Sequence, residues 1–135
     1  MIEKIMYNNE IIAIVSKRNL DDKEKSLEFY TPSDNPLQIG TLNHPRGYVI
    51  PSHIHNNVER RITETQEMLY VEKGKMRVSF LTESNEKIDE RTLNPGDLVV
   101  LMRKGHGFEF LEDSRVIYVK QGPYLDKAAD KRVFN

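Results

Sequence analysis

Two histidines separated by one residue are the clearest candidates for chemistry in this chain. They occur in the segment Pro51-Ser52-His53-Ile54-His55. Successive side chains of a β-strand point to opposite faces, so an extended segment would place His53 and His55 on one face, about 7 Å apart along the backbone. Two imidazoles on one face can bind one metal ion. The alternative is a pair of ordinary surface or hydrogen-bonded histidines.

Glu67 is a second candidate, because alternation along residues 67–74 puts its carboxylate on the same face as Leu69 and Val71. A carboxylate at the head of an apolar row is costly to bury without a cation or a hydrogen-bonded partner. In the alternative register, Gln66, Met68 and Tyr70 face inward and Glu67 lies near solvent.

His106 follows the segment Gly96–Gly105, which contains an apolar stretch between two glycine-containing turns. On its own this histidine is more typical of a turn residue than of a ligand. Together with His53, His55 and Glu67 it would give three imidazoles and one carboxylate. That donor set suits a divalent transition metal such as iron, manganese, nickel or zinc, with coordination positions left for water or substrate.

Five further residues are candidates for contact with a substrate. Arg60 and Arg61 could bind a carboxylate or a sugar phosphate through their guanidinium groups, or form a solvated basic pair beside Glu59 and Glu64. The other three lie on predicted strands and would face either a cavity, the packed interior or the surface: Tyr70, Tyr118 and Lys120.

Period-two alternation of apolar residues runs along most of the chain and predicts a single all-β domain over residues 1–135. Residues 4–7 and 10–17 are a predicted hairpin joined by Asn8-Asn9. A charged loop is expected at 21–25, and only the tail, 124–134, is compatible with a short helix. Regularly spaced short strands favour a sandwich or barrel with room for one small ligand. The remaining predicted strands are 26–30, 38–43, 48–50, 52–55, 63–73, 75–82, 87–93, 97–102, 107–111 and 115–120.

Composition narrows the possible partners. The net charge of −1 over 135 residues argues against nucleic-acid binding, which usually needs a basic surplus. The apolar runs are far shorter than the roughly 18 residues that span a membrane, and no hydrophobic signal region precedes them. The chain has no cysteine and hence neither a disulfide nor a thiolate ligand. A cytoplasmic protein is the expectation.

These residues resemble the first motif of the cupin superfamily. That motif has a glycine, five residues, His-x-His, three or four residues, a glutamate, six residues and a second glycine. Gly47, His53, His55, Glu67 and Gly74 match its residue types. The spacing differs at one place, because eleven residues separate His55 from Glu67.

The second cupin motif is matched more loosely, by Gly96 and His106, with a spacing one residue shorter, no internal proline and Phe110 in place of the usual asparagine. Together the motifs cover residues 47–110. The resemblance implies an antiparallel jelly-roll β-barrel whose inner wall carries a metal on His53, His55, Glu67 and His106. It also implies a homodimer, often formed through N-terminal strands.

Three functions remain open from the sequence. The first is a metal-binding cupin that acts on or binds a small polar molecule, such as a sugar, a nucleotide-sugar or an organic acid; an enzyme of this kind would be an isomerase or oxygenase. The second is a metal-independent sugar isomerase or epimerase in which His53 or His55 is the general base. The third is a non-catalytic barrel that binds or senses a carbohydrate or anionic ligand.

Overall fold

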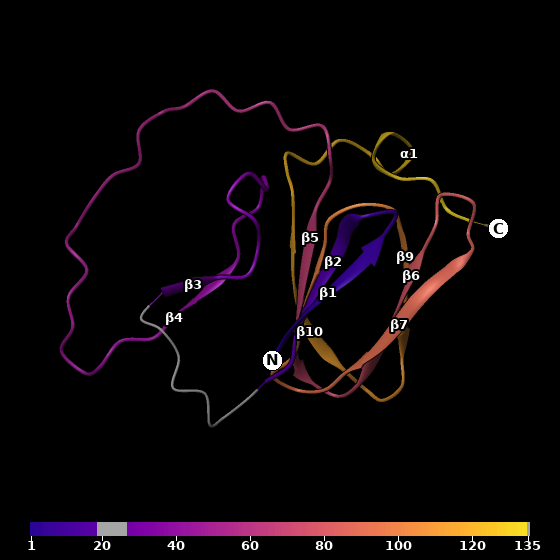
Figure 1. Ribbon diagram of the computed structural model, residues 1–135, viewed down its shortest axis with the longest axis horizontal. Helices are drawn as coiled ribbons and strands as arrows, with labels where there is room; N and C mark the ends of the chain where they lie inside the picture. Colours follow the sequence, from indigo (N-terminus) through magenta and orange to yellow (C-terminus); the bar gives the residue numbers. More distant parts are fainter. Residues whose placement is uncertain (19–26, 135) are drawn as a thin grey trace. The chain divides into compact units, whose positions relative to one another are not determined.

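The computed structural model describes residues 1–18 and 27–134. The chain divides into two compact units, which are described separately: the sandwich unit, residues 1–20 and 64–135, and the insert unit, residues 21–63. All the described strands pair antiparallel, most of them in the sandwich unit, and the one helix in the described ranges is α1, Lys127–Asp130 (Figure 1). The all-β prediction is therefore confirmed. None of the described helical structure is long and apolar enough to cross a membrane.

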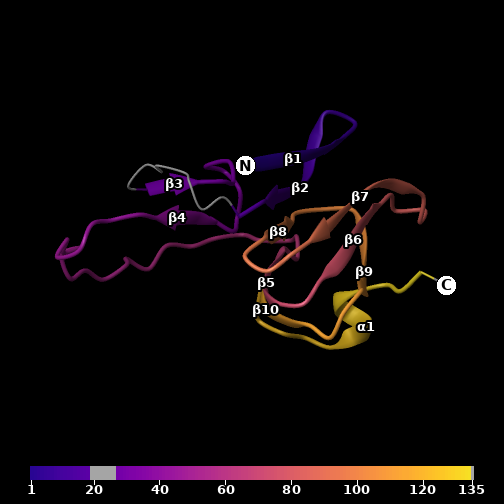
Figure 2. The ribbon, with the colours of Figure 1, turned by 90° about the horizontal axis from the view of Figure 1, so that it is seen from below.

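Two antiparallel sheets make up the sandwich unit. The larger has the strand order β1-β2-β8-β5-β10 and the smaller the order β7-β6-β9, and the described strands do not close into one barrel (Figures 1 and 2). The strands of the larger sheet are β1 (Ile2–Tyr7), β2 (Glu10–Ser16), β8 (Leu98–Leu101), β5 (Glu67–Lys73) and β10 (Arg115–Lys120). Those of the smaller sheet are β7 (Lys87–Leu93), β6 (Met76–Leu81) and β9 (Gly105–Phe110).

The hydrophobic core of this unit lies between the inner faces of the two sheets. Strand β6 shows the pattern most clearly, because its buried and partly buried residues alternate along its whole length. This is the period that a half-buried strand requires. Residues of both sheets fill the core: Ile5, Ile12, Ala13, Val15, Leu69, Val71, Val99 and Leu101 from the larger sheet, and Met76, Val78, Phe80 and Leu93 from the smaller.

Local turn chemistry fixes several of the predicted connections. Asn8 and Asn9 both have positive φ, 48° and 64°, and join β1 to β2 as a two-residue hairpin. Gly74, with φ of 85°, connects β5 to β6, and Gly96, with φ of 92°, precedes β8. Lys104 also has positive φ, 70°, and places the turn before β9. Strand β9 therefore begins at Gly105, two residues before the start predicted at 107, and His106 is a strand residue.

The insert unit contains one antiparallel pair, β3 (Leu27–Phe29) with β4 (Gly40–Leu42). Both strands were predicted; the loop expected at 21–25 lies outside the described residues. The predicted strands at 48–50 and 52–55 are wrong, because no described residue between 43 and 63 is in a strand. In this segment the Tyr48 N–H donates to the Pro45 carbonyl at 3.1 Å, a local turn contact and not a strand pairing. Alternation alone does not make a strand when no neighbouring strand pairs with it.

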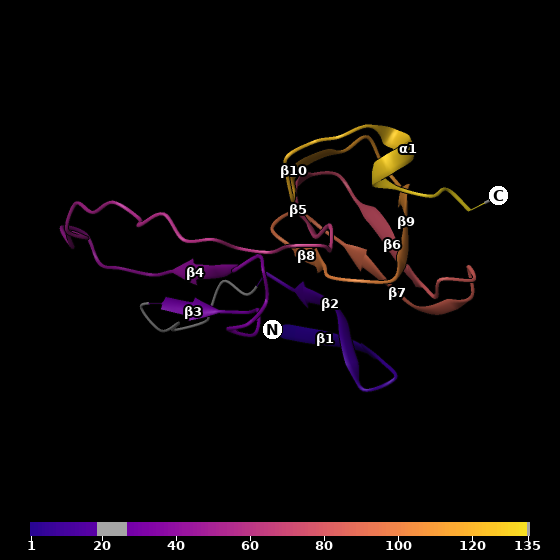
Figure 3. The same cartoon turned by 90° about the horizontal axis from the view of Figure 1, so that it is seen from above.

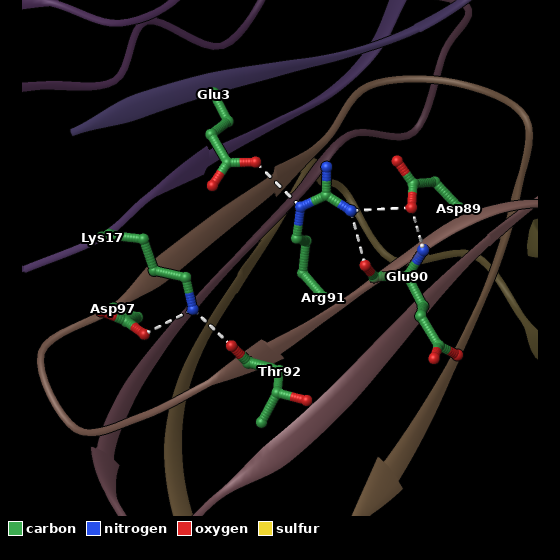
Figure 4. A network of polar contacts seen from close by, with 7 residues as sticks. All are labelled: Glu3, Lys17, Asp89, Glu90, Arg91, Thr92 and Asp97. Carbon is green, nitrogen blue, oxygen red and sulfur yellow. Dashed lines mark hydrogen bonds and ion pairs between the residues drawn. The ribbon is translucent and has the colours of Figure 1, made fainter.

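A polar network links the two sheets of the sandwich unit (Figure 4). Arg91 of β7 donates from Nε to Glu3 of β1 at 2.8 Å and from Nη1 to Asp89 at 2.7 Å. Lys17, just after β2, contacts both the Thr92 carbonyl of β7 and, at 3.0 Å, the carboxylate of Asp97. These contacts join the β1–β2 hairpin to β7 across the sandwich.

Candidate functional site

Glu67, His106 and Tyr118 form a polar cluster in the sandwich unit. Oε1 of Glu67 accepts a hydrogen bond of 2.8 Å from the Tyr118 hydroxyl. The other carboxylate oxygen, Oε2, lies 3.2 Å from Nε2 of His106. The Glu67 side chain is 13% exposed and that of His106 is 30% exposed, so a carboxylate that is largely withdrawn from water is paired with an accessible imidazole.

Three strands position this cluster. Glu67 begins β5 and lies on the same face as the core residue Leu69, as the sequence predicted. Tyr118 of β10 is directly opposite Leu69, which makes it a diagonal neighbour of Glu67 on that face. His106 of β9 is opposite the core residue Phe80 of β6 and so projects from the inner face of the smaller sheet. The cluster thus joins residues of both sheets.

The cluster stabilises the charged form of Glu67. Burial by itself raises the pKa of the Glu67 carboxyl, but the hydrogen bonds from His106 and Tyr118 and the charges of His106 and Lys120 outweigh it, and the pKa lies below its usual value. The pKa of Tyr118 is raised, first by burial and then by its hydrogen bond to Glu67. At neutral pH the cluster therefore contains an ionised carboxylate beside a neutral phenol.

Glu67 and His106 fit the geometry of two ligands on one divalent ion. Bonds from nitrogen or oxygen to zinc are about 2.0–2.2 Å long, so neighbouring ligand atoms are roughly 2.8–3.6 Å apart at octahedral to tetrahedral angles. The observed separation of 3.2 Å between Oε2 and Nε2 falls in this range. Within either unit, among the described residues, no group of three or more His, Asp or Glu side chains is close enough to hold a metal ion.

An open cleft of about 720 Å³ adjoins the cluster, a volume suited to a small molecule. Its wall combines aromatic rings with charged groups of both signs, which would allow contact with the apolar and the polar parts of one ligand. Sixteen residues line it: Thr65, Glu67, Leu81, Glu83, Asn85, Lys104, Gly105, His106, Gly107, Phe108, Tyr118, Asp130, Lys131, Arg132, Val133 and Phe134.

The C-terminal tail contributes to this cleft, which the sequence did not predict. Helix α1 lies beside β9 in Figures 2 and 3. Asp130 pairs with Lys120 of β10, and Arg132 donates to the Glu83 carbonyl at 3.0 Å. The sequence signal for this segment is a helix N-cap, Asp126, which accepts from the Ala129 N–H at 2.9 Å. A capping signal predicts the helix but not the strands that it approaches.

His53 and His55 lie in the insert unit, next to each other and exposed. Their ring centroids are 5.3 Å apart in an edge-on arrangement, and Nδ1 of His53 is 2.9 Å from the Pro51 carbonyl. A carbonyl only accepts, so Nδ1 of His53 carries the hydrogen of this contact. The two imidazoles therefore remain neighbours although the segment is not a strand.

The other predicted contact residues divide between the units. Arg60 and Arg61 are exposed in the insert unit, where Arg60 donates to the Val58 carbonyl at 3.4 Å. Tyr70 lies on the opposite face of β5 from Glu67 and does not line the cleft. Tyr118 is part of the cluster. Lys120 is directly opposite Glu67 in the pairing of β10 with β5.

No family model matches this chain, and comparisons with curated proteins and with solved structures found no similar protein.

Proposed function

We propose that this protein is a metal-binding protein of the cupin type that takes a small polar molecule into the cleft beside Glu67 and His106. The observation that carries the proposal is the 3.2 Å approach of Glu67 Oε2 to His106 Nε2. One residue comes from the segment that resembles the first cupin motif and the other from the segment that resembles the second. If one metal ion bound both Glu67 and His106, these residues, far apart in the sequence, would have to lie this close together.

The resemblance to the first cupin motif makes His53 and His55 of the insert unit further candidate ligands. This part of the proposal rests on the His-x-His spacing and on the two rings being neighbours, and the ion would be iron, manganese, nickel or zinc. A bound divalent ion would act as a Lewis acid toward a substrate oxygen or bound water. Glu67 would contribute a charged oxygen ligand, His106 a ring nitrogen, and Tyr118 a hydroxyl that orients the carboxylate.

Metal binding in solution tests this proposal. Protein purified without a metal-affinity step, then treated with EDTA and dialysed, is titrated with Zn²⁺ by calorimetry. We expect about one equivalent to bind and the affinity to fall roughly tenfold or more in both Glu67→Gln and His106→Gln, as is usual when a ligand is lost. Glu109→Gln is the matched control, because Glu109 is on β9 but pairs with Arg77 at 2.6 Å on the outer face. Absence of binding, or equal affinities in all four proteins, would contradict the proposal.

A metal-independent acid–base function is the second candidate. The ionised Glu67 and the neutral Tyr118, 2.8 Å apart, are a group that can accept a proton and a group that can donate one. A small polar ligand in the cleft, such as a keto-sugar, would meet both groups. A metabolite screen by thermal shift on the EDTA-treated protein separates the candidates, because this second function requires ligand binding to persist without metal.

A further inference from the structure

Lys120 faces Glu67 across two paired strands but forms its ion pair with another residue. The pairing of β10 with β5 places Lys120 and Glu67 directly opposite each other, on the same face of the sheet. Such residues have Cβ atoms about 4.5–5.5 Å apart, well within reach of a lysine side chain. Lys120 Nζ instead contacts Asp130 Oδ2 and lies 5.5 Å from the centre of the Tyr124 ring.

Several contacts fix Asp130 in this position. Its backbone N–H donates to the Asp126 carbonyl at 2.9 Å, which closes the single turn of α1. Beyond the helix, the Phe134 ring packs against β9 at Gly105, where an added Cβ would lie 2.9 Å from Phe134 Cε2. The Asp130 side chain is 14% exposed and that of Lys120 is 21% exposed, so the pair is partly shielded from water.

A lysine ammonium group bound to the Glu67 carboxylate would compete with a metal ion for its oxygens. The carboxylate is ionised, and its oxygens are otherwise contacted by Tyr118 and His106. Lysine would bind the same oxygens and would place a positive charge where a divalent cation must bind. Without Asp130, the nearest carboxylate that the strand pairing offers to Lys120 is Glu67.

We propose that Asp130 is a positioning residue: it binds Lys120 and thereby keeps Glu67 and His106 open to a cation. This inference rests on the proposed metal function of the same cluster. It assigns to the C-terminal tail a role in the site that is separate from lining the cleft.

Zn²⁺ titration of the full chain tests the inference through rescue. We expect Asp130→Asn to weaken binding by about three- to fivefold, the upper end of the effect of a competing partly exposed ion pair. Lys120→Met in the Asp130→Asn background should restore the affinity to within about twofold of the wild type. The matched control adds Lys127→Met instead, which removes a positive charge of the same tail from an exposed position that does not line the cleft. Rescue by both second substitutions would indicate a general charge effect and overturn the inference, as would rescue by neither.

A crystal structure of Asp130→Asn provides a test that does not depend on metal. We expect Lys120 Nζ to move to within about 4 Å of a Glu67 carboxylate oxygen, the usual limit of an ion pair. If Lys120 stays away from Glu67, the inference is wrong whatever the affinities. If the wild type binds no Zn²⁺ but Lys120 moves as expected, the proposed function fails while the positioning role of Asp130 stands.

Discussion

Single side chains in this protein obtain their chemical character from their neighbours. Glu67 is an unusual residue for the inner face of a sheet, since an unpaired carboxylate there would be costly. The Tyr118 hydroxyl and the His106 imidazole remove that cost by contacting both of its oxygens. The same contacts leave a carboxylate and a nitrogen at a spacing suited to two metal ligands.

The two histidines of the insert unit give a direct test of the motif. We expect His53→Ala combined with His55→Ala to abolish stoichiometric metal binding while the protein stays folded, because both rings are exposed and outside the hydrophobic core. Elemental analysis and circular dichroism measure the two effects. Unchanged metal content would refute the assignment of His53 and His55 as ligands.

Glu67→Gln belongs to the same experiment. We expect it to reduce metal retention less than the loss of either histidine does, because glutamine keeps an oxygen ligand. His44→Gln is the control for the removal of a histidine as such. Its ring is stacked on Tyr48 at 3.9 Å, outside the His-x-His segment.

Secondary-structure elements of the sandwich unit depend on a few turn residues. Gly74 links β5, which begins with Glu67, to β6, which pairs with β9 and His106. Its φ of 85° is in the left-handed region, and a Cβ at this position would lie 2.2 Å from Ser114 Oγ and 2.6 Å from the Asp113 carbonyl oxygen. Both the backbone conformation and the lack of space require glycine.

Gly74→Ala should therefore destabilise the protein by about 1–3 kcal/mol, since it adds backbone strain and a steric clash. Urea unfolding measures the change. Gly107→Ala is the control, because a Cβ at Gly107 meets nothing within 4 Å. Equal stability of the two variants would show that the turn at Gly74 adapts to a side chain.

Across the whole sandwich unit, polar contacts supplement the core in joining the two sheets. Arg91 of β7 connects Glu3 of β1 with Asp89, and these side chains are 28–42% exposed. Exposed ion pairs contribute at most about 1 kcal/mol each. The network is therefore a modest addition to the burial of the core between the sheets.

The stability contribution of this network should depend on pH. The hydrogen bond from Arg91 is the main cause of the lowered pKa of Asp89, together with the Glu90 backbone N–H and nearby positive charges, and these outweigh burial. Because the pKa is lower in the folded state than its usual value of 3.8, the stabilisation is present above that pH. It is lost as the pH falls through the folded-state pKa.

Asp89→Asn tests this dependence. We expect the variant to be less stable than the wild type at pH 7 by up to about 1 kcal/mol, and the difference to shrink at pH values below the folded-state pKa. Urea unfolding at a series of pH values measures it. Asp113→Asn, at an exposed aspartate in the turn after β9, is the control. A difference that stays constant down to low pH would contradict the expected titration of Asp89.

Local sequence signals were sufficient for the strands of the sandwich unit and for the inward direction of Glu67. Alternation depends only on neighbours in the chain, and Asn8-Asn9 specifies a hairpin turn without help from other segments. The same reasoning failed for 52–55, because a strand needs a partner that local alternation does not supply. It also placed the start of the next strand at 107, whereas the turn at Lys104 is followed directly by β9 at Gly105.

Residue types and their periodicity are enough to predict an all-β chain and to select Glu67 and His106 as candidates. The pairing of Glu67 with His106 and Tyr118, and the approach of the C-terminal tail through Asp130, follow from how β5, β9 and β10 are arranged in space. Distances between residues remote in the chain depend on strand register and sheet packing, which are collective properties of the folded protein.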